Sequence, residues 1–580
     1  MEKYQILGRM YGFRVQNLTL TRLCQQEVIT AVNGEFPGPT IEVHEGDTLV
    51  VHVFNESPYN VTIHWHGVFQ LRSGWADGPE YVTQCPILPG NKYTYRFDIT
   101  GQEGTLWWHA HSQWLRATVY GALIIRPRNG HLYSFPKPLE EFQILLGEWW
   151  NSSIIEIENQ ALSDGHGPNI SNAFTINGQP GDLYDCSSDG TYRLKVIQGE
   201  TYLLRIINAA LNNQLFFKIA NHTMTVVAVD ACYTNPLVSD IVVIAPGQTV
   251  DVLLTADQPL ASYYMAAHPY DSLGFEYDKT TTTGIIIYEN TTSSSPLMPI
   301  LPAFNDTATA FKFYSNLTSL VNGPFWAPVP LKIDKHMFVM EGLGLVPCGA
   351  NNTCTAFLGM QFAASMNNES FELPTKLSML EASFYNLTSG IYTTDFPDYP
   401  PLVFNYTDKS NSLNISLVIP SRSTRVTKLK FNSTVQIVFQ NTALVGVENH
   451  PIHLHGHNFY VLAQGFGNYD DVIGPKMFNL INPQKRSTYG VPVGGWAVIR
   501  FTANNPEEQG NINFAVATYL RPLKLLDLLP LSTSKLLDLL PLDAASPTTM
   551  DEPPPPPYPL FSLLHLKQSP FIATRPTNNP

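Results

Sequence analysis

The chain of 580 residues carries a formal net charge of −14, and only 14% of its residues are charged. It is long enough for about three or four domains of ordinary size. It has no long basic block and no run of about 18 uncharged apolar residues, so we expect neither a nucleic-acid partner nor a membrane span.

The first 130 residues are predicted to form a β domain. Short apolar runs such as 48–54 and 121–125 alternate with turns, and 93–97 shows the period-two pattern of a strand. Strands spaced by roughly 8–12 residues are typical of a sandwich or a barrel. The Pro, Asn and Gly residues at 127–130 indicate the end of this domain.

A second β domain is predicted at 140–290. Its apolar strands are expected at 201–208, 225–230 and 249–254. It holds no pair of histidines separated by one residue. We therefore interpret it as structural, or as part of a surface that binds the substrate.

A third β domain is predicted at 400–506. It follows residues 291–399, interpreted as a linker and irregular region because they begin with a stretch rich in Thr, Ser, Asn and Pro. After Pro506 the strand pattern stops, so we expect this domain to be truncated. The loss of its last strands would leave an unpaired sheet edge.

Residues 507–580 are predicted to form a mostly disordered tail. A Leu-rich run at 524–531 is repeated at 535–542, and a polyproline run at 553–557 is expected to be extended. The repeat is too short for a solenoid unit. It is compatible with short amphipathic helices that dock as peptides, or with unselected sequence.

The cysteines and glycosylation motifs indicate a secreted glycoprotein. The six cysteines are widely spaced, which favours disulfides over a zinc cluster and leaves their pairing open: Cys24, Cys85, Cys186, Cys232, Cys348 and Cys354. Glycosylation motifs are dense, for example at Asn17, Asn60, Asn316 and Asn386. No secretory signal is visible at the start of the chain, so we expect the leader to be missing from this sequence.

Three histidine motifs predict a metal centre. They are His64-Trp65-His66, His109-Ala110-His111 and His450-Pro451-Ile452-His453-Leu454-His455. In a strand, residues i and i+2 point to the same side, so each pair can bind one metal, while the intervening residues pack into apolar cores. Neutral imidazole suits copper, zinc, iron and nickel. One pair alone is usually incidental, but three in one chain predict metal binding.

Longer motifs around these histidines resemble those of plant laccases, in the multicopper oxidase family. The resemblance covers nearly all of residues 10–506 and includes the segments 33–40, 64–70, 75–79, 104–122 and 177–182. It implies an all-β fold of three cupredoxin-like Greek-key domains, with a three-copper cluster between the first and the third. It also implies one-electron oxidation of lignin-related phenols coupled to four-electron reduction of O₂ to water.

The resemblance also implies which residues bind copper. The type 2 copper is assigned to His64 and His453, the type 3 pair to His66, His109, His111 and His455, and the type 1 copper to His450. The family is expected to carry four copper ions per monomer. We further expect a monomer in the apoplast, active in lignin degradation and in detoxification of lignin-derived products, with phenols and O₂ as partners.

Two residues near these motifs have open or indirect roles. Asp77 lies where the family has a carboxylate near the type 2 copper, so it is either a proton relay or simply the turn residue of an Asp-Gly pair. His457 is expected on the same strand face as His453 and His455, but the family does not use it as a ligand. We interpret it as structural.

The sequence departs from the family after Pro506. There the family has a His-Cys-His-x-x-x-His motif, which supplies the type 1 thiolate and three histidine ligands, whereas residues 507–580 contain no cysteine and only His565. A blue copper site needs a thiolate and two imidazoles. The alternative function is therefore a copper-binding secreted glycoprotein with impaired catalysis. An oxidase of ascorbate or ferrous iron is a weaker third hypothesis.

Overall fold

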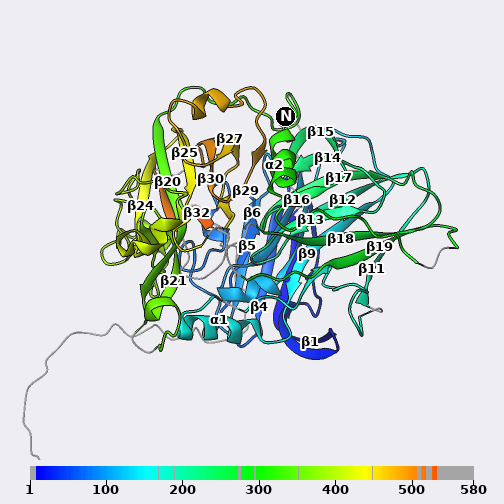
Figure 1. The fold of residues 1–580 in the computed structure, drawn as a ribbon, viewed down its shortest axis with the longest axis horizontal. Helices are drawn as coiled ribbons and strands as arrows, with labels where there is room; N and C mark the ends of the chain where they lie inside the picture. Colours follow the sequence, from blue (N-terminus) through cyan, green and yellow to red (C-terminus); the bar gives the residue numbers. More distant parts are fainter. Residues whose placement is uncertain are drawn as a thin grey trace, which may run out of the picture. The chain divides into compact units, whose positions relative to one another are not determined.

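The computed structural model describes residues 8–505, 511–517 and 526–531, except 168, 188–189, 272–275, 293–294, 350–351 and 447. The fold is predominantly β, as predicted (Figure 1). Its sheets come in three pairs, called here the first, second and third sheet pairs. Within the described residues, no helix has both the length and the apolar character needed to cross a membrane.

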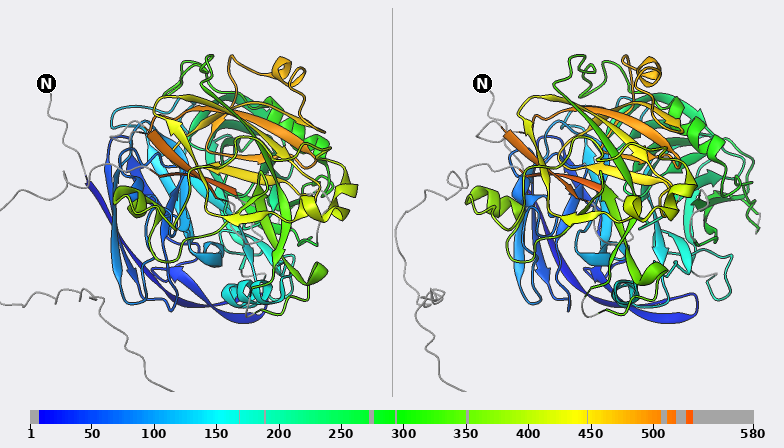
Figure 2. Two further views of the ribbon diagram at one scale, coloured as in Figure 1. Left: turned by 90° about the vertical axis from the view of Figure 1, so that its left-hand side faces the viewer. Right: turned by 60° about the vertical axis from the view of Figure 1, so that its left-hand side comes forward.

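The first sheet pair contains one sheet in the order β2-β1-β4-β6 and another in the order β3-β8-β7-β5. Side chains of β4 alternate between buried and more exposed, so one of its faces meets the core, whereas β7 is buried on both faces. The blue strands of the first of these sheets lie side by side in Figure 2. The elements are β1 (Gly8–Arg22), β2 (Gln25–Val32), β3 (Ile41–His44), β4 (Thr48–Asn55), β5 (Ile63–His66), η1 (Gly74–Ala76), β6 (Lys92–Asp98), β7 (Gly104–Ala110), η2 (Gln113–Ala117) and β8 (Tyr120–Arg126).

The second sheet pair contains the sheets β10-β9-β12-β17-β14-β15 and β11-β19-β18-β13-β16. Its central strands β12 and β17 are almost entirely buried, which explains their unbroken apolar runs. Helix α1 begins at the cap residue Ser153, whose side chain accepts a hydrogen bond from the Glu156 N–H, and ends at Gly165. The elements are β9 (Glu141–Trp149), α1 (Ile154–Asp164), β10 (Ala173–Ile176), β11 (Tyr192–Val196), β12 (Thr201–Asn208), β13 (Gln214–Ile219), β14 (Met224–Val229), β15 (Cys232–Ser239), β16 (Val242–Ile244), β17 (Thr249–Thr255), β18 (Ser262–Tyr270) and β19 (Thr282–Tyr288).

The third sheet pair contains the sheets β23-β22-β21-β20-β25-β30-β27-β28 and β24-β31-β32-β26-β29. The neighbouring strands β20, β25, β30 and β27 are labelled in Figure 1. The strands are β20 (Lys335–Pro347), β21 (Met360–Met366), β22 (Glu369–Phe371), β23 (Ser421–Ser423), β24 (Val426–Lys430), β25 (Thr434–Asn441), β26 (His450–Leu454), β27 (Phe459–Phe466), β28 (Lys485–Arg486), β29 (Thr488–Val491), β30 (Gly495–Thr502), β31 (Asn511–Ala517) and β32 (Leu526–Leu531). The helices after the second sheet pair are α2 (Thr307–Asn316), η4 (Phe357–Gly359), α3 (Met379–Phe384), η5 (Lys409–Leu413), α4 (Ile415–Val418) and η6 (Gly474–Met477).

The segment 291–399 differs from the irregular linker that we expected. It contributes β20, β21 and β22 to the third sheet pair, because β20 carries a run of apolar residues that pairs in parallel with β25. β20 was not predicted from the sequence because the segment begins with a stretch rich in Thr and Ser, which is typical of a linker. We propose that the third domain begins at Lys335 rather than at residue 400.

The expectation that strands end at Pro506 is wrong. Two later segments form β31, which pairs with β24, and β32, which pairs in parallel with β26 and antiparallel with β31. The open edges of β24 and β26 provide unpaired backbone groups that these segments satisfy. The first Leu-rich run therefore contains a strand instead of a helix. The second run at 535–542, the polyproline run and His565 lie outside the described residues.

The cysteines form two of the expected disulfides. Cys24 is bonded to Cys186, and Cys348 to Cys354. Of the described cysteines, Cys85 and Cys232 are in neither bond. The first disulfide joins the turn between β1 and β2 to the loop between β10 and β11, across 162 residues of chain.

Candidate metal centre

Two neighbouring strands of the first sheet pair bring four of the predicted histidines together. β5 and β7 pair antiparallel, with His64 opposite His109. Opposed residues of such strands lie about 4.5–5.5 Å apart at their Cα atoms. The ring centroids of His64 and His109 are 5.2 Å apart, and that of His111, just past the end of β7, is 5.4 Å from His64. The sheet pairing thus joins two motifs separated by more than 40 residues of chain.

Histidines of the third sheet pair reach the same place. The ring of His453, in β26, stacks on that of His66 with 3.7 Å between centroids. The ring of His455 lies 4.2 Å from that of His64. We name the resulting group the histidine cluster; its members are His64, His66, His109, His111, His453 and His455.

Nitrogen atoms of five of the six members of the histidine cluster, all except His111, come close enough to share metal ions. One atom each of His64, His453 and His455 lie within 4.8 Å of one another, and so do atoms of His64, His66 and His109. His64 belongs to both groups, so the cluster is continuous between the first and third sheet pairs. The five residues of these two groups are buried.

Backbone and side-chain oxygens hold most of these imidazoles by their Nδ1 atoms. His64 Nδ1 lies 2.8 Å from the Asp77 carbonyl oxygen, His109 Nδ1 lies 2.9 Å from that of Ala110, and His453 Nδ1 lies 2.9 Å from that of Ser487. A carbonyl oxygen can only accept, so each Nδ1 carries the proton and Nε2 is left as the lone-pair donor. The Nε2 atom of His64 is buried without a hydrogen-bond partner, as a metal ligand would be.

His66 is held in the opposite orientation. Its Nε2 lies 2.9 Å from the Thr488 hydroxyl, and its Nδ1 faces Nε2 of His109 at 3.3 Å. Because His109 Nε2 carries a lone pair, it can accept a hydrogen bond from His66 Nδ1 or share a metal ion with it. Trp107 packs beside both rings and supports this arrangement.

The surroundings keep His64, His66 and His109 neutral, which is the form of imidazole that binds metal. Burial, followed by the charge of His455, lowers the pKa of His64 to about 4. Burial also lowers the pKa of His66 and of His109 well below its ordinary value. The residues between the paired histidines, Trp65, Ala110 and Leu454, are buried in apolar cores, as expected.

Asp77 links the histidines of the two sheet pairs. Its Oδ2 lies 2.9 Å from His455 Nδ1, and its Oδ1 lies 3.3 Å from His64 Nδ1. Burial alone would raise the pKa of this carboxyl, but His64 and His455 outweigh burial and lower it. Asp77 is also a turn residue, because Gly78 follows with φ +99° and a Cβ there would lie 2.0 Å from the Ile63 carbonyl oxygen.

The residues that hydrogen-bond to the metal-binding histidines or to their immediate partners were not identified from the sequence. The Thr488 hydroxyl lies 3.0 Å from His453 Nδ1 as well as 2.9 Å from His66. The backbone N–H groups of Ser487 and Thr488 donate to Asp230 Oδ2 at 3.2 and 3.1 Å. Asp230, from the second sheet pair, also pairs with the buried Arg486 at 3.0 Å. No spacing in the sequence indicated this contact, because its partners are 256 residues apart.

His450 and His457 lie apart from these groups of ligand atoms. Among the described residues, no group of three close ligand atoms includes His450 or a cysteine. His457 is not on the expected strand face, because β26 ends at Leu454 and Gly456 adopts φ +70°. Its ring instead packs against Phe501.

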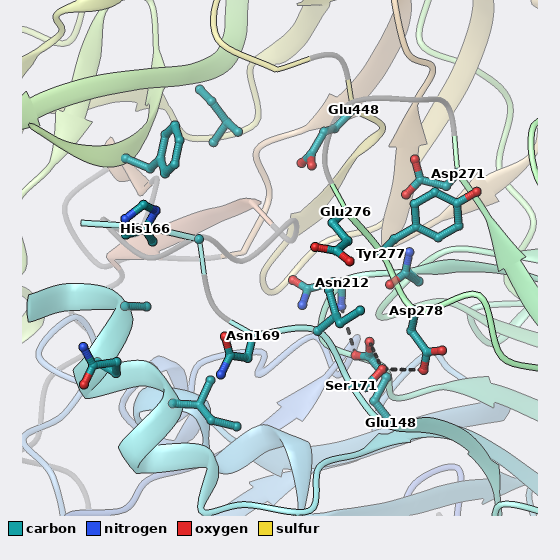
Figure 3. Close-up of a pocket in the computed structure, with 18 of the residues that line it drawn as sticks. Glu148, His166, Asn169, Ser171, Asn212, Asp271, Glu276, Tyr277, Asp278 and Glu448 are labelled. Atoms are coloured by element: carbon teal, nitrogen blue, oxygen red, sulfur yellow. Dashed lines mark hydrogen bonds between the residues drawn. The ribbon is translucent and has the colours of Figure 1, made fainter. Parts of the chain in front are cut away.

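His450 instead lines a cavity between α1, the second sheet pair and β20–β21. The cavity has a volume of about 620 Å³ and includes the aromatic rings of Tyr277 and Phe362. Figure 3 shows several of its acidic side chains around a common space, with Ser171 between Glu148 and Asp278. Volumes of about 300–1,000 Å³ are typical of small-molecule sites.

The donor set of the histidine cluster fits copper. It offers several neutral imidazoles, and imidazole suits copper as well as zinc. The buried and unpartnered Nε2 of His64 is explained by a bound ion, since an orphaned polar atom is otherwise costly. The ring positions described above place the imidazoles of both sheet pairs within reach of shared ions.

Comparisons with known proteins agree with this chemistry. Sequence models described as multicopper oxidase match residues 14–130, 140–291 and 395–508. Laccase-7 of Arabidopsis thaliana is 60% identical over 503 residues, which are 86% of this chain and 88% of that protein. Laccase-24 of Oryza sativa subsp. japonica is 54% identical over 513 residues, covering 86% and 88%.

Solved structures show the same fold. The crystal structure of the laccase from Botrytis aclada is 25% identical and covers 88% of this chain and 85% of its own, with a TM-score of 0.64. The crystal structure of Fet3p, a multicopper oxidase that functions in iron import, is 22% identical, covers 90% of each chain and has a TM-score of 0.68.

Proposed function

Because the chain belongs to the multicopper oxidase family, as a laccase of the plant type, we propose that it oxidises phenols by single electrons and reduces O₂ to water. The observation that carries this proposal is the histidine cluster, in which imidazoles from the first and third sheet pairs approach within 4.8 Å. Copper ions held there would pass on single electrons taken from phenols, and four such electrons are needed to reduce one O₂ to water.

The chain's own residues would bind and orient the copper ions. We assign the type 2 ion to His64 and His453, and the type 3 pair to His66, His109, His111 and His455. Copper supplies one-electron redox chemistry and the binding of O₂. Asp77 orients His64 and His455 and could move protons toward the cluster, while burial of the ligands limits access of bulk water.

A second candidate function rests on the missing type 1 thiolate. His450 is the remaining type 1 ligand, and the sequence after Pro506 has no cysteine. We infer that the histidine cluster forms without a type 1 site beside His450. On this hypothesis the chain is a copper-binding glycoprotein whose cluster receives electrons slowly or not at all.

We further propose that the protein works in the apoplast as a monomeric glycoprotein on lignin-related phenols. Asn17, Asn60, Asn316 and Asn386, each in a glycosylation motif, are all exposed. Two disulfides fit an oxidising compartment.

One experiment separates the two candidates. The full chain would be loaded with copper, and its copper content, its blue absorption and its O₂ uptake with a simple phenol would be measured. Phenol-dependent O₂ uptake supports the laccase activity. Bound copper without blue absorption and without O₂ uptake supports the second candidate, and a protein that binds no copper contradicts both.

A further inference from the structure

We propose that the cavity beside His450 is a binding site that prefers cationic phenols, such as phenolic amines, over phenols that carry a carboxylate. This inference rests on the proposed function, because it concerns the substrate class of that same site. The evidence is the charge of the cavity lining, its shape and one buried polar group.

The lining of the cavity is strongly acidic. It contains six carboxylates and, among the described residues, no lysine or arginine; the carboxylates belong to Glu148, Asp164, Asp271, Glu276, Asp278 and Glu448. Figure 3 shows the labelled carboxylates along one side of the space, with His166 and Asn169 on the other. A positive group on a ligand is therefore attracted toward the acidic side, and a ligand carboxylate is repelled from it.

The carboxylates have different environments. Glu148 and Asp278 are buried and accept hydrogen bonds from the chain, for example from the Leu211 N–H at 2.6 Å and from the Thr280 N–H at 2.7 Å. Glu276 is exposed, and no hydrogen bond or ion pair of its side chain occurs among the described residues. Glu276 is thus available to a ligand, while the two buried carboxylates are engaged by hydrogen bonds from the chain.

The cavity fits an organic cation better than a metal ion. The groups in which three ligand atoms approach within 4.8 Å consist of histidines alone among the described residues, so these carboxylates are too dispersed to enclose an ion. Instead the lining mixes the acids with Tyr277, Phe362 and aliphatic side chains. Apolar and aromatic walls with a few polar groups are typical of sites for small organic molecules.

A buried donor marks where the phenol oxygen would bind. Asn213 lines the cavity and is 4% exposed, and its Nδ2 has no hydrogen-bond partner. An unsatisfied buried amide is costly, so a ligand oxygen at this position would be stabilised. With the phenol oxygen near Asn213, a side chain on the opposite end of the ring points away from it, toward the acidic lining.

Three probes of nearly the same size test the proposal by binding alone. Tyramine, tyrosol and 3-(4-hydroxyphenyl)propionate share the phenol ring and differ in carrying an amine, an alcohol or a carboxylate. Their dissociation constants for the full chain would be measured by calorimetry at low and high salt. A pair of unit charges about 7 Å apart at an effective dielectric constant of about 40 changes an affinity about seven-fold.

We expect tyramine to bind about ten-fold more tightly than tyrosol, and tyrosol about ten-fold more tightly than the carboxylate, with smaller ratios at high salt. In the double variant Glu276→Gln/Glu448→Gln, the ratio of the dissociation constant of 3-(4-hydroxyphenyl)propionate to that of tyramine should fall at least about five-fold. Asn213→Leu should weaken all three probes equally. Glu200→Gln is the matched control, because Glu200 is exposed, immediately precedes β12 and is not among the residues that line the cavity.

Equal binding of the three probes, tighter binding of the carboxylate, or no binding would overturn the proposal. So would a charge preference that the Glu276→Gln/Glu448→Gln variant leaves unchanged, provided that its melting temperature shows a folded protein. These measurements need no turnover. A chain that prefers tyramine but fails to consume O₂ would refute the proposed oxidase activity and leave this inference standing.

Discussion

Replacement of Asp77 by asparagine is expected to weaken copper binding without unfolding the protein. Asp77 is 3% exposed, and its carboxylate reaches His455 Nδ1 at 2.9 Å and His64 Nδ1 at 3.3 Å. An amide of the same shape keeps one accepting oxygen and presents an N–H group to the other imidazole. The amide oxygen can still accept from His455 Nδ1, and His64 Nδ1 keeps the Asp77 carbonyl oxygen at 2.8 Å, but both imidazoles lose the neighbouring negative charge.

The size of the effect follows from these contacts. The bond from His455 to the carboxylate is a hydrogen bond to a charged group, worth about 1.5–3 kcal/mol, whereas a bond to a neutral amide oxygen is worth about 0.5–1.5 kcal/mol. The difference of roughly 1–2 kcal/mol predicts an affinity that is roughly ten-fold to thirty-fold weaker. This lies within the range of about 10–100-fold found when residues that orient metal ligands are replaced. Competition with a copper chelator would measure the dissociation constant.

A matched control separates orientation from general stability. Asp47 is also buried in the first sheet pair, and its carboxylate accepts from the His44 N–H at 3.0 Å, away from the histidine cluster. Asp47→Asn should lower the melting temperature and leave the copper affinity unchanged. If Asp77→Asn binds copper as tightly as the unchanged chain, Asp77 does not orient the ligands and the reasoning is refuted.

Three further predictions concern the residues around the site. Thr488→Val should weaken copper binding about ten-fold, because its hydroxyl contacts two ligands, and Thr488→Ser should restore it, as the same competition assay would show. Asp230→Asn should lower the free energy of unfolding by about 3–5 kcal/mol in chemical denaturation, because Arg486 would keep a buried charge without its counterion; a loss below about 1 kcal/mol would contradict this. Burial lowers the pKa of His268 in the folded protein to about 4, below the value of about 6.5 expected in the unfolded chain. The unfolded chain therefore binds a proton on His268 more tightly, and the free energy of unfolding falls as the pH drops from about 6.5 toward 4. His268→Phe should remove up to about 3 kcal/mol of that pH dependence, measured by melting the metal-free protein at several pH values.

The sequence predicted the metal-binding histidines but not the residues that hold them in place. Histidines two residues apart share a strand face by a local rule, so the pairs at His64 and His109 could be identified without a structure. The contact between Asp230 and Thr488 depends on how two sheet pairs pack, which no local pattern encodes. The strands β31 and β32 were missed as well, although Ile512, Phe514 and Val516 alternate with other residues in β31; they pair with β24 and β26.

The central claim is that histidines from the first and third sheet pairs bind shared copper ions, and copper content per chain tests it most directly. The unchanged chain, His64→Ala and His453→Ala would be loaded with copper under the same conditions and checked for folding by circular dichroism. We predict about three copper ions in the unchanged chain and a loss of most of them in either variant, because the ions share ligands. Variants that each lose one ion and keep the rest, or a chain that binds no copper, would contradict the claim.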